Sequence, residues 1–144
     1  MITSKIGILG EDLAESFLVK RGFKIIERNH LKKWGEIDIV AKKDKSIRFV
    51  EVKAVSCPSF GVLTKEDEII GKYVSRETYL DGFRPEENVH KYKLERLNRV
   101  IQTYLSQNRV SPETPYQIDV VAVWIDVKTK YARVELLENV GEFG

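Results

Sequence analysis

The stretch GEIDIVAKKDKSIRFVEVK, residues 35–53, contains two segments in which apolar residues alternate with other residues. Such alternation is typical of β-strands that pack one face against a core. We therefore predict strands over residues 36–41 and 46–53, joined by a polar turn. Each strand carries an acid where a hydrophobic residue would be expected, Asp38 in the first and Glu51 in the second.

Side-chain direction predicts the surroundings of the first acid. Alternate residues of a regular strand share a face, so Ile37, Ile39 and Ala41 are expected on one face. Asp38 is then expected on the other face, together with Val40. The acid therefore emerges from partly apolar surroundings.

Glu51 is expected between Phe49 and Lys53 on one face of its strand. Leaving both acids unpaired near the ends of neighbouring strands would cost free energy. A divalent cation removes that cost, and hard oxygen ligands favour Mg²⁺ or Mn²⁺. Lys53, two residues beyond Glu51, would reach a water or a phosphate at the cation.

The rest of the pattern predicts two helices and three more strands. The helices are predicted at 5–21 and 89–107, and the strands at 23–29, 117–125 and 131–137. Glu11 lies on the shoulder of the first helix's apolar face, and Lys93 lies within the apolar arc of the second. The predicted order is helix, three strands, helix, two strands.

Composition bounds the class of protein. A chain of 144 residues with 42% hydrophobic and 32% charged residues is ordinary for one globular domain. No apolar run approaches the roughly 18 residues of a membrane span, and the start does not resemble a signal peptide. A single cysteine, Cys57, excludes an intramolecular disulfide. These features favour a cytoplasmic protein without membrane contact.

Asp38, twelve residues and then Glu51-Val52-Lys53 resemble the PD-(D/E)xK signature of the restriction-endonuclease-like superfamily. The segments GEDLAESFLVKRGFKIIERN, GEIDIVA and FVEVK follow one another in this order. Together with VHKYKLERLNRVIQTYL and IDVVAV, they resemble the bacterial YraN-like family of predicted nucleases, which are related to archaeal Holliday junction resolvases.

The resemblance implies an α/β fold with a restriction-endonuclease-like core. That core consists of a helix, a three-stranded meander, a helix and two strands, with a mixed central sheet flanked by helices. We expect residues 1–144 to form a single nuclease-like domain with an irregular insertion at about 54–88. The implied activity is metal-dependent hydrolysis of DNA, and the likeness to resolvases also implies branched substrates and a homodimer.

The resemblance also assigns roles to individual residues. Glu11 matches the first-helix acid, Asp38 and Glu51 match the metal ligands, and Lys53 matches the catalytic lysine. The Val52 carbonyl would also bind Mg²⁺ or Mn²⁺, and Glu11 would bind it directly or through a water. The sequence departs from the family at Val55, where a basic residue is usual, and in the greater length of the segment that follows Lys53.

Basic residues flank the predicted site and are expected to contact DNA phosphates without reading bases. They are Arg28, Lys32, Lys33 and Lys93. The alternative function is a catalytically weak nucleic-acid-binding accessory module of the same fold. A third is a structural cation site in a protein-interaction domain.

Other polar residues receive simpler interpretations. Glu36 is expected to have a secondary role or to form a salt bridge, and Asp119 to form a structural ion pair. His30 and His90 lack metal-ligand spacing and are expected at the surface. Trp34 would either stack on a base or cap a turn.

Overall fold

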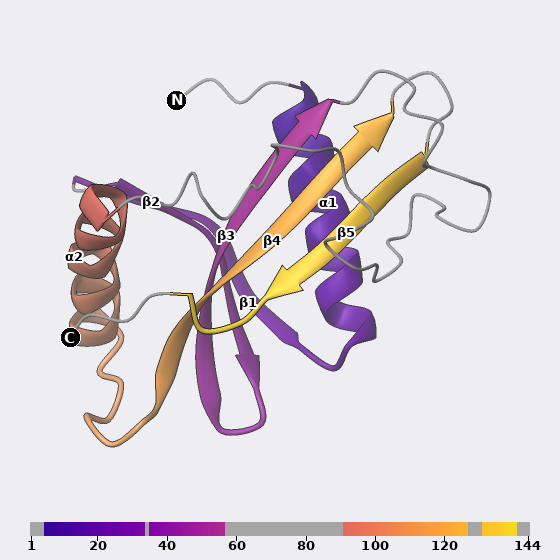
Figure 1. Cartoon of the computed structure of the whole chain (residues 1–144). Helices are drawn as coiled ribbons and strands as arrows, with labels where there is room; N and C mark the ends of the chain where they lie inside the picture. Colours follow the sequence, from indigo (N-terminus) through magenta and orange to yellow (C-terminus); the bar gives the residue numbers. More distant parts are fainter. Residues whose placement is uncertain (1–4, 34, 57–90, 127–130, 141–144) are drawn as a thin grey trace.

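The computed structural model describes residues 5–33, 35–56, 91–126 and 131–140 (Figure 1). Within these ranges, the side chains of residues 55–56, 91–94 and 131 are not described. The elements are α1 (Lys5–Lys20), β1 (Lys24–Lys32), β2 (Gly35–Lys43), β3 (Ser46–Ser56), α2 (Lys91–Gln107), β4 (Tyr116–Asp126) and β5 (Tyr131–Leu137). This order confirms the predicted succession of helices and strands.

The strands form one mixed sheet in the order β1-β2-β3-β4-β5. The pairs β1–β2, β2–β3 and β4–β5 are antiparallel, whereas β3 and β4 are parallel. The predicted meander and the mixed sheet flanked by helices are therefore confirmed. The strands are longer than predicted: β1 continues to Lys32, and β3 continues to Ser56 into the segment predicted to be irregular.

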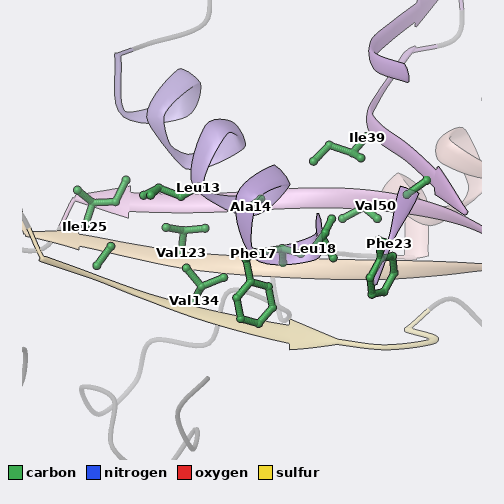
Figure 2. Close-up of a cluster of buried hydrophobic side chains, with 13 residues drawn as sticks. Leu13, Ala14, Phe17, Leu18, Phe23, Ile39, Val50, Val123, Ile125 and Val134 are labelled. Atoms are coloured by element: carbon green, nitrogen blue, oxygen red, sulfur yellow. The ribbon is translucent and has the colours of Figure 1, made fainter. Parts of the chain in front are cut away.

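The helix α1 covers one face of the sheet (Figure 2). Its buried side chains pack against the central strands and against Phe23, which follows the helix. The helical contributors are Leu13, Ala14, Phe17 and Leu18, and the sheet contributors include Ile39, Val50, Val123, Ile125 and Val134. Because this layer is assembled from β2 to β5, it holds the parallel and antiparallel halves of the sheet together.

The helix α2 packs against a second hydrophobic cluster, centred on β2 and the start of β3. Its buried residues are Leu97, Val100, Ile101 and Tyr104, and they meet Ile37, Val40, Phe49 and Ile118. In Figure 1 the start of β2 lies beside α2, away from α1. The two helices thus cover different parts of the sheet.

The predicted alternation along β2 is wrong at one point. Ile39 and Ala41 pack in the cluster under α1, as expected for residues that share a face. Ile37 instead packs with Val40 in the cluster under α2. Since residues 37 and 39 of a regular strand would share a face, the alternation breaks at Asp38.

His30 is buried, which corrects the expectation of a surface histidine. Only 8% of the residue is exposed, and its Nδ1 lies 2.5 Å from Glu27 Oε2. Its ring meets the Tyr104 ring edge-on, with centroids 5.1 Å apart. An aromatic pair of this geometry stabilises the contact of β1 with α2. Trp34, Cys57 and His90 lie outside the described residues.

Asp119 forms the structural ion pair that was predicted. Its side chain is fully buried, and its Oδ2 accepts a hydrogen bond from Arg48 Nη1 at 3.0 Å. Its Oδ1 accepts from Gln117 Nε2 at 2.8 Å and from the Asn139 N–H at 2.9 Å. Arg48 also pairs with Glu138 at 2.8 Å. The network joins β3, β4 and the segment after β5.

Gly10 allows α1 to approach β3 closely. A Cβ atom at this position would lie 2.4 Å from the Ala54 Cβ. Elsewhere in a helix, alanine would be favoured over glycine by roughly 1 kcal/mol. Here the helix would have to move away from the sheet instead.

We expect Gly10→Ala to lower the free energy of unfolding by about 1–3 kcal/mol, because the added methyl overpacks the contact. Ala54→Gly in the same chain should recover most of that loss, since the atom that clashes is removed. Urea unfolding followed by circular dichroism measures both. A Gly10→Ala protein more stable than the wild type would contradict the close contact.

Candidate functional site

The candidate site forms where β2 and β3 separate. Their antiparallel register runs from Lys43↔Ser46 to Ile39↔Val50, while β3 stays paired with β4 as far as Ser56. Backbone N–H groups on the edge that β2 leaves require other partners. The Val52 N–H donates to Asp38 Oδ2 at 2.8 Å. The acid therefore takes the place of the missing strand backbone.

The same geometry directs a backbone carbonyl into the gap. In a strand, the N–H and the C=O of one residue point towards the same neighbour. Because the Val52 N–H meets Asp38, the Val52 carbonyl also faces the side on which Asp38 lies. This residue was predicted to offer its carbonyl to a cation.

Three carboxylates gather at this point. Glu11 from α1 and both Glu36 and Asp38 from β2 offer oxygen atoms that all lie within 4.8 Å of one another. The side chain of Glu11 is 12% exposed. The structure thus brings the predicted first-helix acid next to the predicted central ligand.

Glu51 and Lys53 belong to the adjacent part of β3. Glu51 is 8% exposed, and Lys53 is half-buried. The charge of Glu51 acts on both Asp38 and Glu36. Its position in the register is opposite Val120, and that of Lys53 is opposite Ala122. Glu51 is thus within electrostatic reach of two of the three clustered acids, Asp38 and Glu36, although it is not one of the three.

Burial and mutual repulsion make the site favour the uncharged acids. Burial, followed by the charge of Glu51, raises the pKa of Asp38 to about 8 from an ordinary value of 3.8. The hydrogen bond from Val52 opposes this shift without cancelling it. Burial and then the charges of Glu11 and Glu51 also raise the pKa of Glu36. A cation placed among these acids would oppose both shifts, because a nearby positive charge favours the charged form of an acid.

Arg28, predicted to contact DNA, lies against the acids of α1. Its Nη1 is 2.9 Å from Asp12 Oδ1 and 3.8 Å from Glu15 Oε1, and its Nη2 is 3.4 Å from Glu11 Oε1. In the structure, Arg28 ties β1 to α1 and neutralises part of the charge beside the site.

The other predicted DNA contacts lie at the end of β1 and in α2. Lys32 pairs with Gly35, the register position next to the Leu31↔Glu36 pair. Lys33 follows it and is exposed. These two lysines therefore lie at the end of β1, just beyond the register pair that contains Glu36. Lys93 belongs to α2, but its side chain lies outside the described residues.

Glu36 is the site residue that the sequence interpretation undervalued. It was expected to have a secondary role, yet its carboxylate is one of the three that gather. Its spacing of two residues from Asp38 on one strand was the available signal, because alternate strand residues project in the same direction. The helical partner Glu11 could be identified only through the family resemblance.

The donor set determines what the site can bind. All the clustered side chains offer carboxylate oxygens, and the neighbouring backbone offers a carbonyl. Neither cysteine nor histidine is among the clustered ligand atoms of the described residues. Hard oxygen ligands of this kind suit Mg²⁺ or Mn²⁺ better than Zn²⁺ or copper.

The raised pKa of Asp38 leads to a stability prediction for the metal-free protein. Between pH 4 and pH 8 the folded protein binds a proton that the unfolded chain releases, so stability falls as pH rises. Asp38→Asn removes this dependence and keeps an acceptor for the Val52 N–H. We expect the variant to exceed the wild type by about 2 kcal/mol or more at pH 8, and to gain less near pH 4.

Urea unfolding in the presence of a chelator, at pH 5 and pH 8, measures this difference. Asp44→Asn is the matched control, because Asp44 is exposed and has a positive φ that asparagine also tolerates. Equal pH dependence in Asp38→Asn and the wild type would contradict the shift.

None of the described helices combines the length and apolar character that a membrane crossing requires.

Comparison with known proteins places the chain in a family. The model of "Uncharacterised protein family UPF0102" matches residues 10–123. A UPF0102 protein of Caldicellulosiruptor bescii is 30% identical over 139 residues, which cover 96% of this chain and 98% of the relative.

A UPF0102 protein of Campylobacter jejuni is 36% identical over 121 residues, or 84% of this chain and 85% of the relative. One from Moorella thermoacetica is 32% identical over 139 residues, or 96% and 97%. The matched range includes the acids described above, and the resemblance to the YraN-like family is confirmed at this level. The chain belongs to the uncharacterised protein family UPF0102.

Proposed function

We propose that this protein is a metal-dependent endonuclease that hydrolyses DNA phosphodiester bonds. The observation that carries the proposal is the position of Asp38, a largely buried carboxylate in the gap between two separating strands. Acids from α1, β2 and β3 surround it. A cluster so costly in the absence of a cation supports a site built to bind one.

The residues present fit Mg²⁺ or Mn²⁺. Asp38, Glu51 and the Val52 carbonyl would hold the cation, with Glu11 contributing directly or through a water. Glu36 adds negative charge beside them. A bound divalent cation supplies Lewis-acid polarisation of a phosphate and acidification of water.

Lys53 would supply the positive charge on the substrate side. It follows Glu51 by two residues, so that both project from the same face of β3. Its ammonium group would orient the attacking water and stabilise negative charge that develops on the phosphate. Lysine is not a cation ligand, so it acts beside the metal without belonging to its coordination.

DNA is the substrate that suits both the clustered acids and the nearby basic residues. A protein that only bound DNA would gain nothing from clustered acids, because they repel phosphates. Two basic residues at the end of β1, Lys32 and Lys33, would contact phosphates of the DNA backbone. Selectivity for branched DNA and a homodimeric assembly follow from the likeness to resolvases alone.

Two substitutions separate chemistry from binding. We expect Asp38→Asn to abolish cleavage with Mg²⁺ or Mn²⁺ while DNA affinity stays equal or improves slightly, because a negative charge near phosphate is lost. Lys53→Ala should lower the cleavage rate by about 10²-fold or more, the usual cost of one charge-stabilising donor, and still bind Mn²⁺. Cleavage of linear, single-stranded and four-way-junction DNA measures the activity.

Asp44→Asn and Lys45→Ala are the controls, since both residues are exposed in the turn between β2 and β3. Wild-type protein that binds DNA but cleaves none of these substrates with either metal would overturn the proposal. It would then favour a catalytically weak DNA-binding accessory module with this fold.

Lys32 tests the direction from which DNA approaches. We expect Lys32→Gln to weaken binding of all DNA sequences alike and to lower the slope of log affinity against log salt by about 1. Lys42→Gln is the control, because Lys42 pairs with Lys24 at the opposite end of the β1–β2 pair. Fluorescence anisotropy at several salt concentrations measures both. Equal slopes in the two variants would place the DNA elsewhere.

A further inference from the structure

Beyond the register shift between Ile25 and Glu27, the alternation of side chains along β1 breaks at one further residue. Arg28 contacts the acids of α1, whereas His30 packs against Tyr104 of α2. Residues two apart on a regular strand share a face, so the residue between them must break the alternation. Asn29 does so, because its φ is +54°. A left-handed conformation costs roughly 1 kcal/mol for most residues, and asparagine tolerates it better than most.

The break in β1 faces the break in β2. Arg28 pairs with Ile39 and His30 pairs with Ile37, which puts Asn29 opposite Asp38. Asp38 is also the point at which β2 loses its alternation between the two clusters. Both strands therefore depart from regular geometry at the same position, beside the acidic cluster.

The Asn29 side chain contacts two of the clustered acids. Its amide nitrogen donates to Glu36 Oε1 at 2.8 Å and to Glu11 Oε1 at 3.1 Å. The amide orientation is assigned from the hydrogen-bond network. The reverse orientation would set the amide oxygen against two carboxylate oxygens. One NH₂ group has two hydrogens, enough to satisfy one bond to each acid.

We propose that Asn29 is a positioning residue that holds Glu11 of α1 and Glu36 of β2 at the spacing the cation requires. This rests on the metal site of the proposed function. Glu11 and Glu36 repel each other, and the amide bridges them without adding a charge. A lysine or arginine in the same place would neutralise the acids and compete with a divalent cation. Arg28, the charged neighbour, pairs chiefly with Asp12 at 2.9 Å.

The test compares one substitution at two asparagines of equal backbone geometry. Asn29→Gly keeps the left-handed φ at little cost and removes the amide. Asn139→Gly is the matched control, because Asn139 has a φ of +55° and belongs to the buried Asp119 network. Mn²⁺ alone is the probe, and electron paramagnetic resonance of the free ion gives its affinity for each protein.

We expect Asn29→Gly to bind Mn²⁺ about tenfold more weakly than the wild type, the usual cost of losing a partner of a metal ligand. Asn139→Gly should bind it like the wild type, and urea unfolding should show that Asn29→Gly remains folded. If Asn29→Gly keeps wild-type affinity while Asp38→Asn loses it, Asn29 is not a positioning residue and the metal site stands. If the wild type binds no Mn²⁺, the proposed metal site fails, and this inference fails with it.

A second measurement tests the contact without any metal. The side-chain amide signal of Asn29, assigned by its absence from Asn29→Gly, should shift in Glu11→Gln and in Glu36→Gln. It should remain in place in Asp12→Asn, which removes a neighbouring acid that contacts Arg28 instead. An Asn29 signal unaffected by either glutamate substitution would overturn the inference.

Discussion

The hydrogen bond from the Val52 N–H to the Asp38 carboxylate is the interaction on which the candidate site depends. β3 pairs with β2 on one edge only as far as Val50, and with β4 on the other edge as far as Ser56. On the part of the β3 edge that β2 no longer covers, the Asp38 carboxylate accepts the backbone hydrogen bond. One side chain thus satisfies a backbone donor and brings a carboxyl group to the place where the sheet opens.

Two aspartates show how surroundings assign different roles to the same side chain. Asp119 receives three hydrogen bonds, one of them from the guanidinium of Arg48. Asp38 receives the Val52 N–H and otherwise faces acids. The first is neutralised by the protein itself and holds strands together. The second requires a proton or a cation, and the pKa near 8 expresses that requirement.

Departures from regular strand geometry place the site between the two helices. Because alternation breaks at Asn29 and at Asp38, the β1–β2 pair sends side chains to the cluster under α1 and to the cluster under α2. In a regular strand pair, all the side chains on one face would pack into the same cluster. The same departure turns Asn29 towards Glu36 and Glu11. Local strain at this position accompanies the gathering of the acids.

The sequence by itself determined the order of helices and strands, the positions of Asp38, Glu51 and Lys53 on them, and the family. Short-range periodicity and residue spacing suffice for the elements and the residue positions, because strand alternation and helical repeat are properties of neighbouring residues. The family followed from the resemblance of the quoted segments. Periodicity and spacing did not determine which acids meet, and it was the family resemblance that placed Glu11 in one site with Asp38. Glu11 is distant from Asp38 along the chain, and Glu36 was expected to be secondary.

Only the tertiary structure decided that Glu11, Glu36 and Asp38 gather, that His30 is buried and that Arg28 pairs with the acids of α1. Each of these depends on how α1 and α2 pack on the sheet. Gly10 allows α1 to lie close to β3, and Tyr104 packs α2 against its own cluster on the sheet. The break in alternation at Asp38 had no local signal either, since it arises where β2 leaves β3 while β3 remains paired with β4.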